Sequence, residues 1–370
     1  MSQAPVLKAS IHDVRYFSAL LRGVNFANRA TVTVTEKGLV VVVEESRTLL
    51  GTAYIFSDVF DEFIYHPDTA GDQASQQQQQ QQQPPGEEIF SAFEIPLNTF
   101  LEILNGFGSA GGSASKKSGR FKAWRKPGDE SEGHESDGNA GEGEGDQEGG
   151  NANKKARTGP FSSGSERKTG MRLTYIGSGY PLAMILAEDA FGPTMSCEIA
   201  TFDAEPHLDL PFDSHQMVLK IIFKSSWLRD ALSELDPSCD KLTFIGNPPD
   251  ITDAGAQTAR QRQRALLRAK PNFRIEATGT FGNTEMDYPN DREVLESFEC
   301  ISPVSFSYRF SHIARTMRAL QTSVKTSLRI DNEGLLSLQF LMPSPMPRMN
   351  SGGVTSNFIE FRCLALDEEV

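Results

Sequence analysis

The sequence predicts an α+β protein of two similar halves, in which antiparallel strands follow each helix. An arrangement of strand, helix and three further strands near the start of the 370 residues recurs three more times along the chain. The first and the last of these units also share a turn glycine and arginines along the polar side of the helix. Four units in tandem therefore predict two domains with similar folds.

The first unit begins with a short apolar run and a helix that Asp13 can cap, because its carboxylate accepts an early free backbone N–H. Residues at helical spacing form an apolar face, and polar residues form the opposite stripe. The apolar face is Val14, Phe17, Leu21 and Val24, and the stripe is Arg15, Ser18 and Arg22. Gly38 supplies the positive φ of the next hairpin turn. The expected elements are a strand at 7–11, a helix at 14–21, strands at 30–35, 39–44 and 49–56, and a helical turn at 58–63.

The second unit follows a glutamine-rich tract at 71–87, which buries too little to fold and predicts a disordered loop. Its helix turns leucines inward and Asn98, Glu102 and Asn105 outward, so it lacks the arginines of the first helix. An insertion at 108–170, with basic, acidic and again basic blocks, is also expected to be disordered. The expected elements are a strand at 88–95, a helix at 97–107 and strands at 171–176, 182–187 and 194–203.

The third unit follows residues 204–216, whose two prolines and mixed acidic and apolar side chains predict an extended connector. Ser225 or Ser226 can cap its helix. The inward side chains are Leu228, Leu232 and Leu235, and the outward ones are Ser225, Arg229 and Ser233. An arginine-rich insertion lies at 248–270. The expected elements are strands at 217–223, 241–245, 273–280 and 284–288 and a helix at 227–235.

The fourth unit begins near Val294, and Ser311 can cap its helix. Its apolar face is Ile313, Met317 and Leu320, and its polar side is Arg315, Arg318 and Thr322. Gly334 aligns with Gly38 and places the two hairpins in the same register. Strands are expected at 306–310, 326–330, 335–341 and 358–366. The predicted domains are therefore 1–203 and 217–370, with the connector at 204–216 between them.

Composition limits the classes of function. The net charge of −13 argues at first against nucleic acid, although an acidic protein can be basic along one inner surface. The four cysteines are widely spaced, without a CxxC or a nearby histidine pair, which argues against a zinc site or disulfide scaffold and fits a reducing compartment. The start lacks the apolar core of a signal peptide, and no run has transmembrane length. We expect a soluble intracellular protein that does not bind a membrane.

Several separated strings resemble the Rad-one-type subunit of the nine-one-one checkpoint clamp. They are LLRGVNFANRATVTVTEKGLVVVVEESRTLLGTAYI at 20–55, LRDALSELD at 228–236, MDYPNDREVLESFEC at 286–300, SLRIDNEGLLSLQFL at 327–341 and FIEFRCL at 358–364. The resemblance leaves out the glutamine tract and the two insertions. It implies the DNA sliding clamp (processivity-factor) fold, with two similar domains and helices on the inner face of antiparallel sheets.

The same resemblance implies a nuclear DNA damage checkpoint protein without a cofactor. Such a clamp is a heterotrimeric ring with two sister subunits, Rad-nine-like and Hus-one-like, and an ATP-driven clamp loader places it on damaged DNA. It encircles double-stranded DNA without reading bases, and it recruits checkpoint kinase signalling and repair enzymes. Ring closure by edge-strand pairing is implied, with candidate outer strands near 182–189 and in the later half of the chain.

Three groups of candidate site residues follow from the resemblance. Cations that would line the hole and attract phosphates are Arg15, Arg22, Lys224, Arg229, Arg315 and Arg318. A groove for partner peptides beside the connector would be formed by Leu208, Leu210, Pro211 and Phe212. A basic cluster suited to nuclear import or nonspecific nucleic-acid contact is Lys154, Lys155 and Arg157. The alternatives are solvated helix faces, a connector merely fastened to the sheet, and a solvated loop without a role.

The sequence predicts no catalytic residues and no metal site. It lacks a P-loop, a GxSxG and an HExxH motif. Two-metal nuclease chemistry needs convergent carboxylates around ions about 4 Å apart. The acidic pairs that could in principle hold magnesium are Glu44 with Glu45 and Asp61 with Glu62. Glu44 and Glu45 are adjacent on a strand and so point to opposite faces. Two alternatives stay open: a homotrimeric replication clamp with the same fold, and a metal-dependent 3′→5′ exonuclease, an activity with which this family has at times been described.

Overall fold

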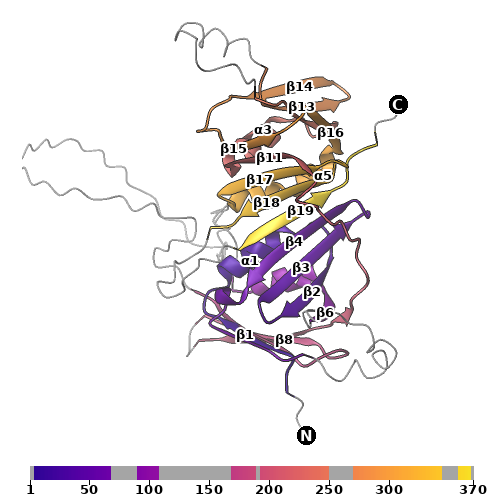
Figure 1. Cartoon of the computed structure of the whole chain (residues 1–370). Helices are drawn as coiled ribbons and strands as arrows, with labels where there is room; N and C mark the ends of the chain where they lie inside the picture. Colours follow the sequence, from indigo (N-terminus) through magenta and orange to yellow (C-terminus); the bar gives the residue numbers. More distant parts are fainter. Residues whose placement is uncertain are drawn as a thin grey trace, which may run out of the picture. The chain divides into compact units, whose positions relative to one another are not determined.

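The structure, a computed structural model, describes residues 4–67, 90–107, 168–188, 192–249, 270–343 and 357–367 (Figure 1). The tract predicted to be disordered at 71–87, nearly all of both insertions, and the import candidates Lys154, Lys155 and Arg157 lie outside these residues. Among the helices described, none is long and apolar enough to cross a bilayer.

The first half of the chain contains the pattern of strand, helix and three strands twice. The first unit is β1 (Leu7–Ile11), α1 (Val14–Gly23), β2 (Arg29–Thr35), β3 (Gly38–Glu45) and β4 (Leu49–Phe56). The second is β6 (Ser91–Pro96), α2 (Leu97–Leu104), β7 (Gly170–Tyr175), β8 (Leu182–Ala187) and β9 (Thr194–Ile199). A 3₁₀ turn η1 (Ser57–Val59) and strands β5 (Glu62–Tyr65) and β10 (Phe202–Asp203) follow these units.

The second half contains the same pattern twice again, which confirms the predicted four-unit order. Its first unit is β11 (Met217–Lys224), α3 (Ser225–Glu234), β12 (Cys239–Gly246), β13 (Phe273–Gly279) and β14 (Gly282–Tyr288). Its second is β16 (Val304–Arg309), helices α5 (Phe310–Arg315) and α6 (Met317–Thr322), β17 (Lys325–Asp331), β18 (Leu336–Leu341) and β19 (Phe358–Cys363). Strand β15 (Leu295–Cys300) lies between the units and, like β5, was not expected.

The strands form three antiparallel sheets, and the two halves pair their strands in the same way. The sheet orders are β5-β1-β7-β8-β9, β10-β6-β2-β3-β4-β19-β18-β17-β11-β15, and β14-β13-β12-β16. Strand β1 pairs with β5 and β7 as β11 pairs with β15 and β17. Strand β8 lies between β7 and β9, so the expectation of an outer strand at 182–189 is wrong, and β9 is the end strand.

Strands β4 and β19 join the two halves into the ten-stranded sheet (Figure 1). Phe358 lies opposite Tyr54, and their rings stack with centroids 4.4 Å apart. Cys363 lies opposite Leu49 at the other end of the pair. The boundaries predicted for the two domains stay a prediction, because this joint makes one continuous sheet across them.

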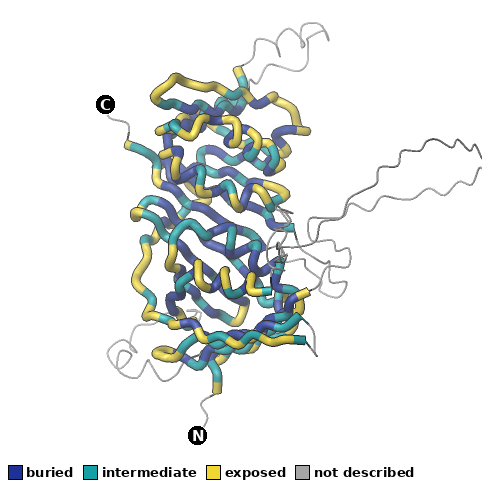
Figure 2. The backbone as a smooth tube through the Cα atoms, turned by 180° about the vertical axis from the view of Figure 1, so that it is seen from behind, coloured by how far each residue is buried: buried dark blue, intermediate teal, exposed yellow. Residues whose placement is uncertain are grey.

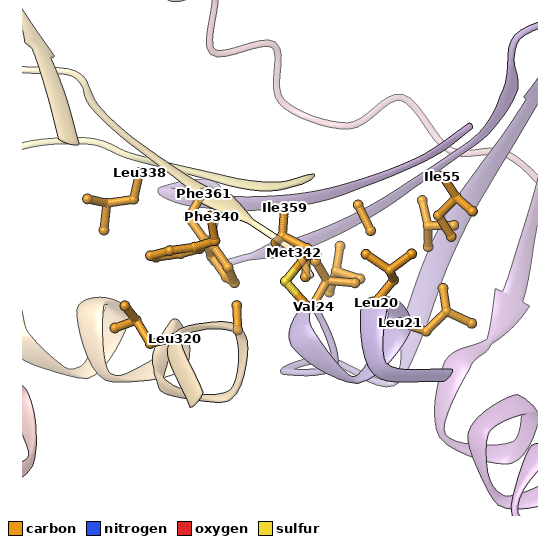
Figure 3. Close-up of a cluster of buried hydrophobic side chains, with 14 of the residues drawn as sticks. Leu20, Leu21, Val24, Ile55, Leu320, Leu338, Phe340, Met342, Ile359 and Phe361 are labelled. Carbon is orange, nitrogen blue, oxygen red and sulfur yellow. The ribbon is translucent and has the colours of Figure 1, made fainter. Parts of the chain in front are cut away.

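Side-chain alternation decides which face of the ten-stranded sheet meets the helices. Leu39, Val41 and Val43 of β3 belong to the main core with α1, whereas Val42 between them belongs to a second cluster on the opposite face. We call these the helix face and the outer face. Figure 2 shows buried stretches through the middle of the backbone and exposed ones mainly toward its edges. Figure 3 shows the core continuing beneath the joint, with Leu20, Leu21, Val24, Ile55, Leu320, Leu338, Phe340, Met342, Ile359 and Phe361.

The helix starts are partly as predicted. The Asp13 side chain accepts the Arg15 backbone N–H, which confirms the cap of α1. The caps predicted at Ser225, Ser226 and Ser311 are wrong, because β11 and β16 run directly into α3 and α5, and Lys224 and Arg309 occupy the N-cap positions without a side-chain bond.

Two further differences concern hydroxyl side chains. The helix of the fourth unit divides at Thr316, whose hydroxyl donates to the Ile313 carbonyl oxygen at 2.7 Å and competes with the helical ladder. Ser18 and Ser225, both predicted to face outward, are buried. The hydroxyl of Ser225 bonds that of Thr326 at 2.9 Å.

Candidate nucleic-acid interface

Four helices form one layer on the helix face. Helix α1 packs against α2 on one side and α6 on the other, and α3 packs against α6, which gives the order α2, α1, α6, α3. The helices also contact strands of the ten-stranded sheet, for example α2 on β2 and β6, and α3 on β11 and β17. Because each unit contributes its helix to this layer, the repeat builds a single polar surface from all four.

Two of the predicted DNA-facing cations meet in a hollow of this layer. The hollow has a volume of about 370 Å³ and is lined by Arg22, Asn25, Asn98, Leu101, Glu102, Asn105 and Arg318. Arg318 donates from Nη1 to the Asn25 carbonyl oxygen at 2.6 Å. Arg22 is half-buried, and burial lowers the pKa of its guanidinium below the usual value. Two cations with neighbouring amides suit phosphate oxygens, and Glu102 is the one acidic side chain in this set.

The other arginines of the predicted set are engaged with acidic side chains. Arg15 binds the Asp13 carboxylate at 2.7 Å, and its side chain is only 13% exposed. Burial pushes the pKa of Asp13 upward, but hydrogen bonds with the side chain and backbone of Arg15 outweigh it and hold the pKa below the usual value. Arg15 is therefore largely neutralised where it lies, and it contributes less to an anion-binding surface than Arg22.

Arg315, Arg229 and Lys224 lie elsewhere along the layer. Arg315 makes a two-point ion pair with Glu45, at 2.9 and 3.0 Å, which ties α5 to β3. Arg229 pairs with its neighbour Asp230 at 2.9 Å on an exposed face of α3. Lys224 is exposed at the end of β11. These cations are spread over different elements, so the structure brings together Arg22 and Arg318 but not the whole predicted set.

The connector lies on the outer face. Leu210 is buried in the second cluster with Val42, Leu50 and Leu335, and Leu208 and Phe212 pack against it. Pro211 alone of the four predicted groove residues is exposed. Backbone groups add anchors: Leu208 N–H donates to the Glu44 carboxylate at 2.8 Å, and the Leu210 carbonyl accepts from Arg362 at 2.8 Å. Three of the four residues thus pack the connector onto the sheet, and the groove for partner peptides stays a prediction.

A buried ionic cluster lies beneath the connector and was not predicted from the sequence. Glu360 of β19 is 3% exposed, and its two carboxylate oxygens bind Arg329 at 2.9 Å and Arg362 at 3.0 Å. Ser337 donates to the same carboxylate at 2.7 Å, and the Arg329 guanidinium lies over the Phe212 ring. The signal was Glu and Arg at alternate positions of an apolar strand, FIEFRC, which places both charges on one face.

The acidic pairs considered for metal chemistry do not converge. Glu44 bonds the connector on the outer face, whereas Glu45 bonds Arg315 on the helix side. Asp61 and Glu62 contact His12 and Lys8 at the five-stranded sheet. Across the described ranges, no group of three or more His, Cys, Asp or Glu side chains is arranged to hold a metal ion.

The sequence matches one protein family over most of its length. A family model described as repair protein Rad1/Rec1/Rad17 matches residues 6–342. A mouse protein named cell cycle checkpoint protein RAD1 is 28% identical over 98% of this chain and 93% of its own. The DNA damage checkpoint control protein rad1 of Schizosaccharomyces pombe is 28% identical over 89% of this chain and 79% of its own. A relative in Mycosarcoma maydis, 27% identical over 98% of this chain and 96% of its own, is named DNA repair exonuclease REC1.

A solved structure shows the fold. The proliferating cellular nuclear antigen of Entamoeba histolytica superimposes with a TM-score of 0.58 at 11% identity, covering 98% of this chain and all of that one. At so low an identity the likeness concerns the fold alone. It confirms the expected sliding-clamp fold, with helices on one face of antiparallel sheets.

Proposed function

The chain belongs to the Rad1/Rec1/Rad17 family of repair proteins, and on that premise we propose that it forms one part of a heterotrimeric ring around DNA. It is a DNA damage checkpoint clamp subunit by its relatives and its fold. The proposal adds what the subunit does in that role. It pairs with two sister subunits, Rad-nine-like and Hus-one-like, and holds duplex DNA against its helix layer without reading bases.

The strand pairing of the two halves carries this proposal. Within the chain, β4 of the first half pairs with β19 of the second. By the repeat, β14 is the counterpart of β4, and β9 is the counterpart of β19. Both counterparts are end strands of their sheets. Unpaired strand edges are templates for further pairing, so β9 and β14 each offer a joint of the kind that β4 and β19 make inside the chain.

Assembly is the first experiment. The chain should be purified together with the two sister subunits of the same organism, and the mass of the complex measured by light scattering. A one-to-one-to-one complex is the expected result. A chain that remains monomeric with both sisters present, across salt and pH, would remove the ring from consideration.

DNA retention is the second experiment, and it uses the hollow between α1, α2 and α6. Arg22→Glu with Arg318→Glu should weaken retention of the loaded ring on closed circular DNA, because both cations lie in the helix layer, and should leave ring assembly intact. Lys220→Glu is the control, since Lys220 lies on the outer face, paired with Glu299. Equal retention by the double variant and wild type would take these arginines out of the DNA-facing surface.

The remaining parts of the proposal concern partners and location. An ATP-driven clamp loader would place the ring, and checkpoint signalling and repair proteins would dock on it in the nucleus. Relatives named for DNA damage checkpoint control support this location. The candidate import cluster Lys154, Lys155 and Arg157 is tested by Lys154→Ala, Lys155→Ala and Arg157→Ala together, with nuclear fluorescence of a tagged chain as the measurement.

We infer a non-catalytic role, and the relative named an exonuclease makes this worth a direct test. The scattered placement of Glu44, Glu45, Asp61 and Glu62 supports the inference. Highly purified chain should not degrade 3′-labelled DNA with Mg²⁺ or Mn²⁺. Activity that co-purifies with the chain through every step and is lost on mutation of one carboxylate would establish an enzyme instead.

A further inference from the structure

The joint between β4 and β19 supplies a register for pairing at β9 and β14. In the first half Leu39 of β3 lies opposite Ile55 of β4, and in the second half Phe273 of β13 lies opposite Tyr288 of β14. Ile55 therefore corresponds to Tyr288, and the residue before it, Tyr54, corresponds to Asp287. Likewise, Leu336 of β18 lies opposite Cys363 of β19, and Leu182 of β8 lies opposite Ile199 of β9, so Cys363 corresponds to Ile199.

The alternation of side chains agrees with this register. Met286 and Tyr288 of β14 pack into the core, as do Ala53 and Ile55 of β4. In these two smaller sheets we also call the face turned away from the core the outer face. Its positions are Asn283, Glu285 and Asp287 on β14 and Thr194, Ser196 and Glu198 on β9. All six are exposed. In the register of the internal joint, Asp287 meets position 194 of a neighbouring β9, Glu285 meets position 196, and Asn283 meets position 198.

The outer face at β14 is acidic. Arg274 of β13 binds Asp287 at 2.5 Å and Glu285 at 2.6 Å, and its third carboxylate partner, Glu276, lies at 3.6 Å. One guanidinium thus faces three carboxylates, which leaves two negative charges unbalanced at the end strand. Glu285 and Asp287 are 57% and 51% exposed, so a neighbouring strand can reach both.

Among the residues that the structure describes, a second copy of this chain brings no cation to that edge. Its β9 would place Thr194 and Ser196 against Asp287 and Glu285, and would put Glu198 diagonal to Glu285. Like charges at such cross-strand positions are destabilising. Arg172, a cation farther along the same face, is on β7, two strands and about 10 Å from the edge. The internal joint differs, since it has stacked Tyr54 and Phe358 rings and Arg362 beside Glu360.

We propose that the β14 edge selects a partner strand with lysine or arginine opposite Glu285 and Asp287, and that the same charges exclude a second copy of this chain. The inference rests on the proposed clamp function and deepens it, because it states which chemistry the neighbour at β14 presents. It also assigns the physical reason why this chain does not close a ring with itself.

The test makes β9 basic. Thr194→Lys with Ser196→Lys places two cations where the register sets them against Asp287 and Glu285 of another copy. Wild type should sediment as a monomer at micromolar concentration. The double variant should self-associate at least tenfold more tightly, about 1.4 kcal/mol, at low salt, and high salt should reverse the effect. Adding Glu285→Lys and Asp287→Lys to the same chain should abolish it.

The control variant carries the same two added positive charges at positions away from β9 and β14. Ser214→Lys with Ser302→Lys adds two lysines at exposed positions away from both end strands, and it should stay monomeric. Circular dichroism confirms that each variant folds. We call the proposed selection by Glu285 and Asp287 the charge rule. Self-association of wild type, or equal self-association of the two lysine variants, would overturn it.

A separate measurement distinguishes this inference from the proposed function. With both sister subunits present, Glu285→Lys with Asp287→Lys should lower the yield of the ternary complex at least tenfold. A ternary complex that forms equally well with this variant would sink the charge rule and leave the clamp intact. Failure of wild type to form any complex would sink the clamp proposal itself.

Discussion

Replacement of Glu360 by glutamine should cost far more stability than its size suggests. Glu360 lies on β19, the strand that joins the two halves, and it is the shared anion between Arg329 and Arg362. Glu360→Gln keeps the shape and removes the charge, so two guanidinium groups are left facing each other under the connector. Breaking a buried ion pair by removing one partner costs about 3–5 kcal/mol.

The exposure of the arginines sets the expected magnitude within that range. Arg329 and Arg362 side chains are 17% and 25% exposed, so water relieves part of the repulsion. We therefore expect the low end, about 3 kcal/mol of lost unfolding free energy. Glu299→Gln is the matched control, because Glu299 pairs with Lys220 and is 56% exposed. It should cost less than about 1 kcal/mol.

Urea unfolding followed by fluorescence measures both variants. A second variant separates charge from packing: Arg329→Met with Glu360→Leu and Arg362→Met removes all three charges together. Such replacements are often neutral or stabilising, so this chain should stay within about 1 kcal/mol of wild type. A loss below about 1 kcal/mol for Glu360→Gln, equal to that of the control, would refute the reasoning that this cluster braces the joint.

Three further predictions concern local stability. Gly38→Ala should lower the free energy of unfolding in urea by about 3 kcal/mol, because φ is +143° and the new Cβ would run into the Ile55 carbonyl oxygen. Gly179→Ala is the control and should lower it by about 1 kcal/mol, because φ is +82° but nothing lies within 4 Å of the new Cβ. Asp13→Ala should cost about 1 kcal/mol through loss of the α1 cap, and an unchanged melting temperature would contradict the capping role. Burial is the largest cause that lowers the pKa of His312, so the folded state disfavours protonation of this side chain. The unfolded chain takes up the proton more readily, and the free energy of unfolding should therefore fall as the pH drops below about 6.5. His312→Asn should reduce this pH dependence.

Local patterns predicted the elements well because each depends on neighbours in sequence. The apolar spacing of α1 and the glycine turns at Gly38 and Gly334 required no knowledge of the rest of the chain. The caps failed at α3 and α5 because a strand that runs straight into a helix leaves its last residue in the capping position. Ser18 is buried for a tertiary reason, since α1 has a helix on each side.

The site was harder to predict because its contacts are far apart in sequence. Arg22 and Arg318 come from the first and the fourth unit, and only packing of α1 on α6 brings them to one hollow. The pairing of Arg315 with Glu45 likewise joins the two halves of the chain. A stripe of arginines can be read from helical spacing, but which of them meets a carboxylate depends on the strand register across the joint.

The pairing of β4 with β19 has a consequence for how a ring of such subunits responds to dilution. Both strands belong to one chain, so they meet at an effective concentration of about millimolar or more, whatever the amount of protein in solution. In the proposed ring, pairs made by β9 and β14 would lack this tether and would depend on the supply of free neighbours. Dilution would therefore separate the ring only at these joints between chains, and a passage for DNA would open there while the two halves of each subunit stay together.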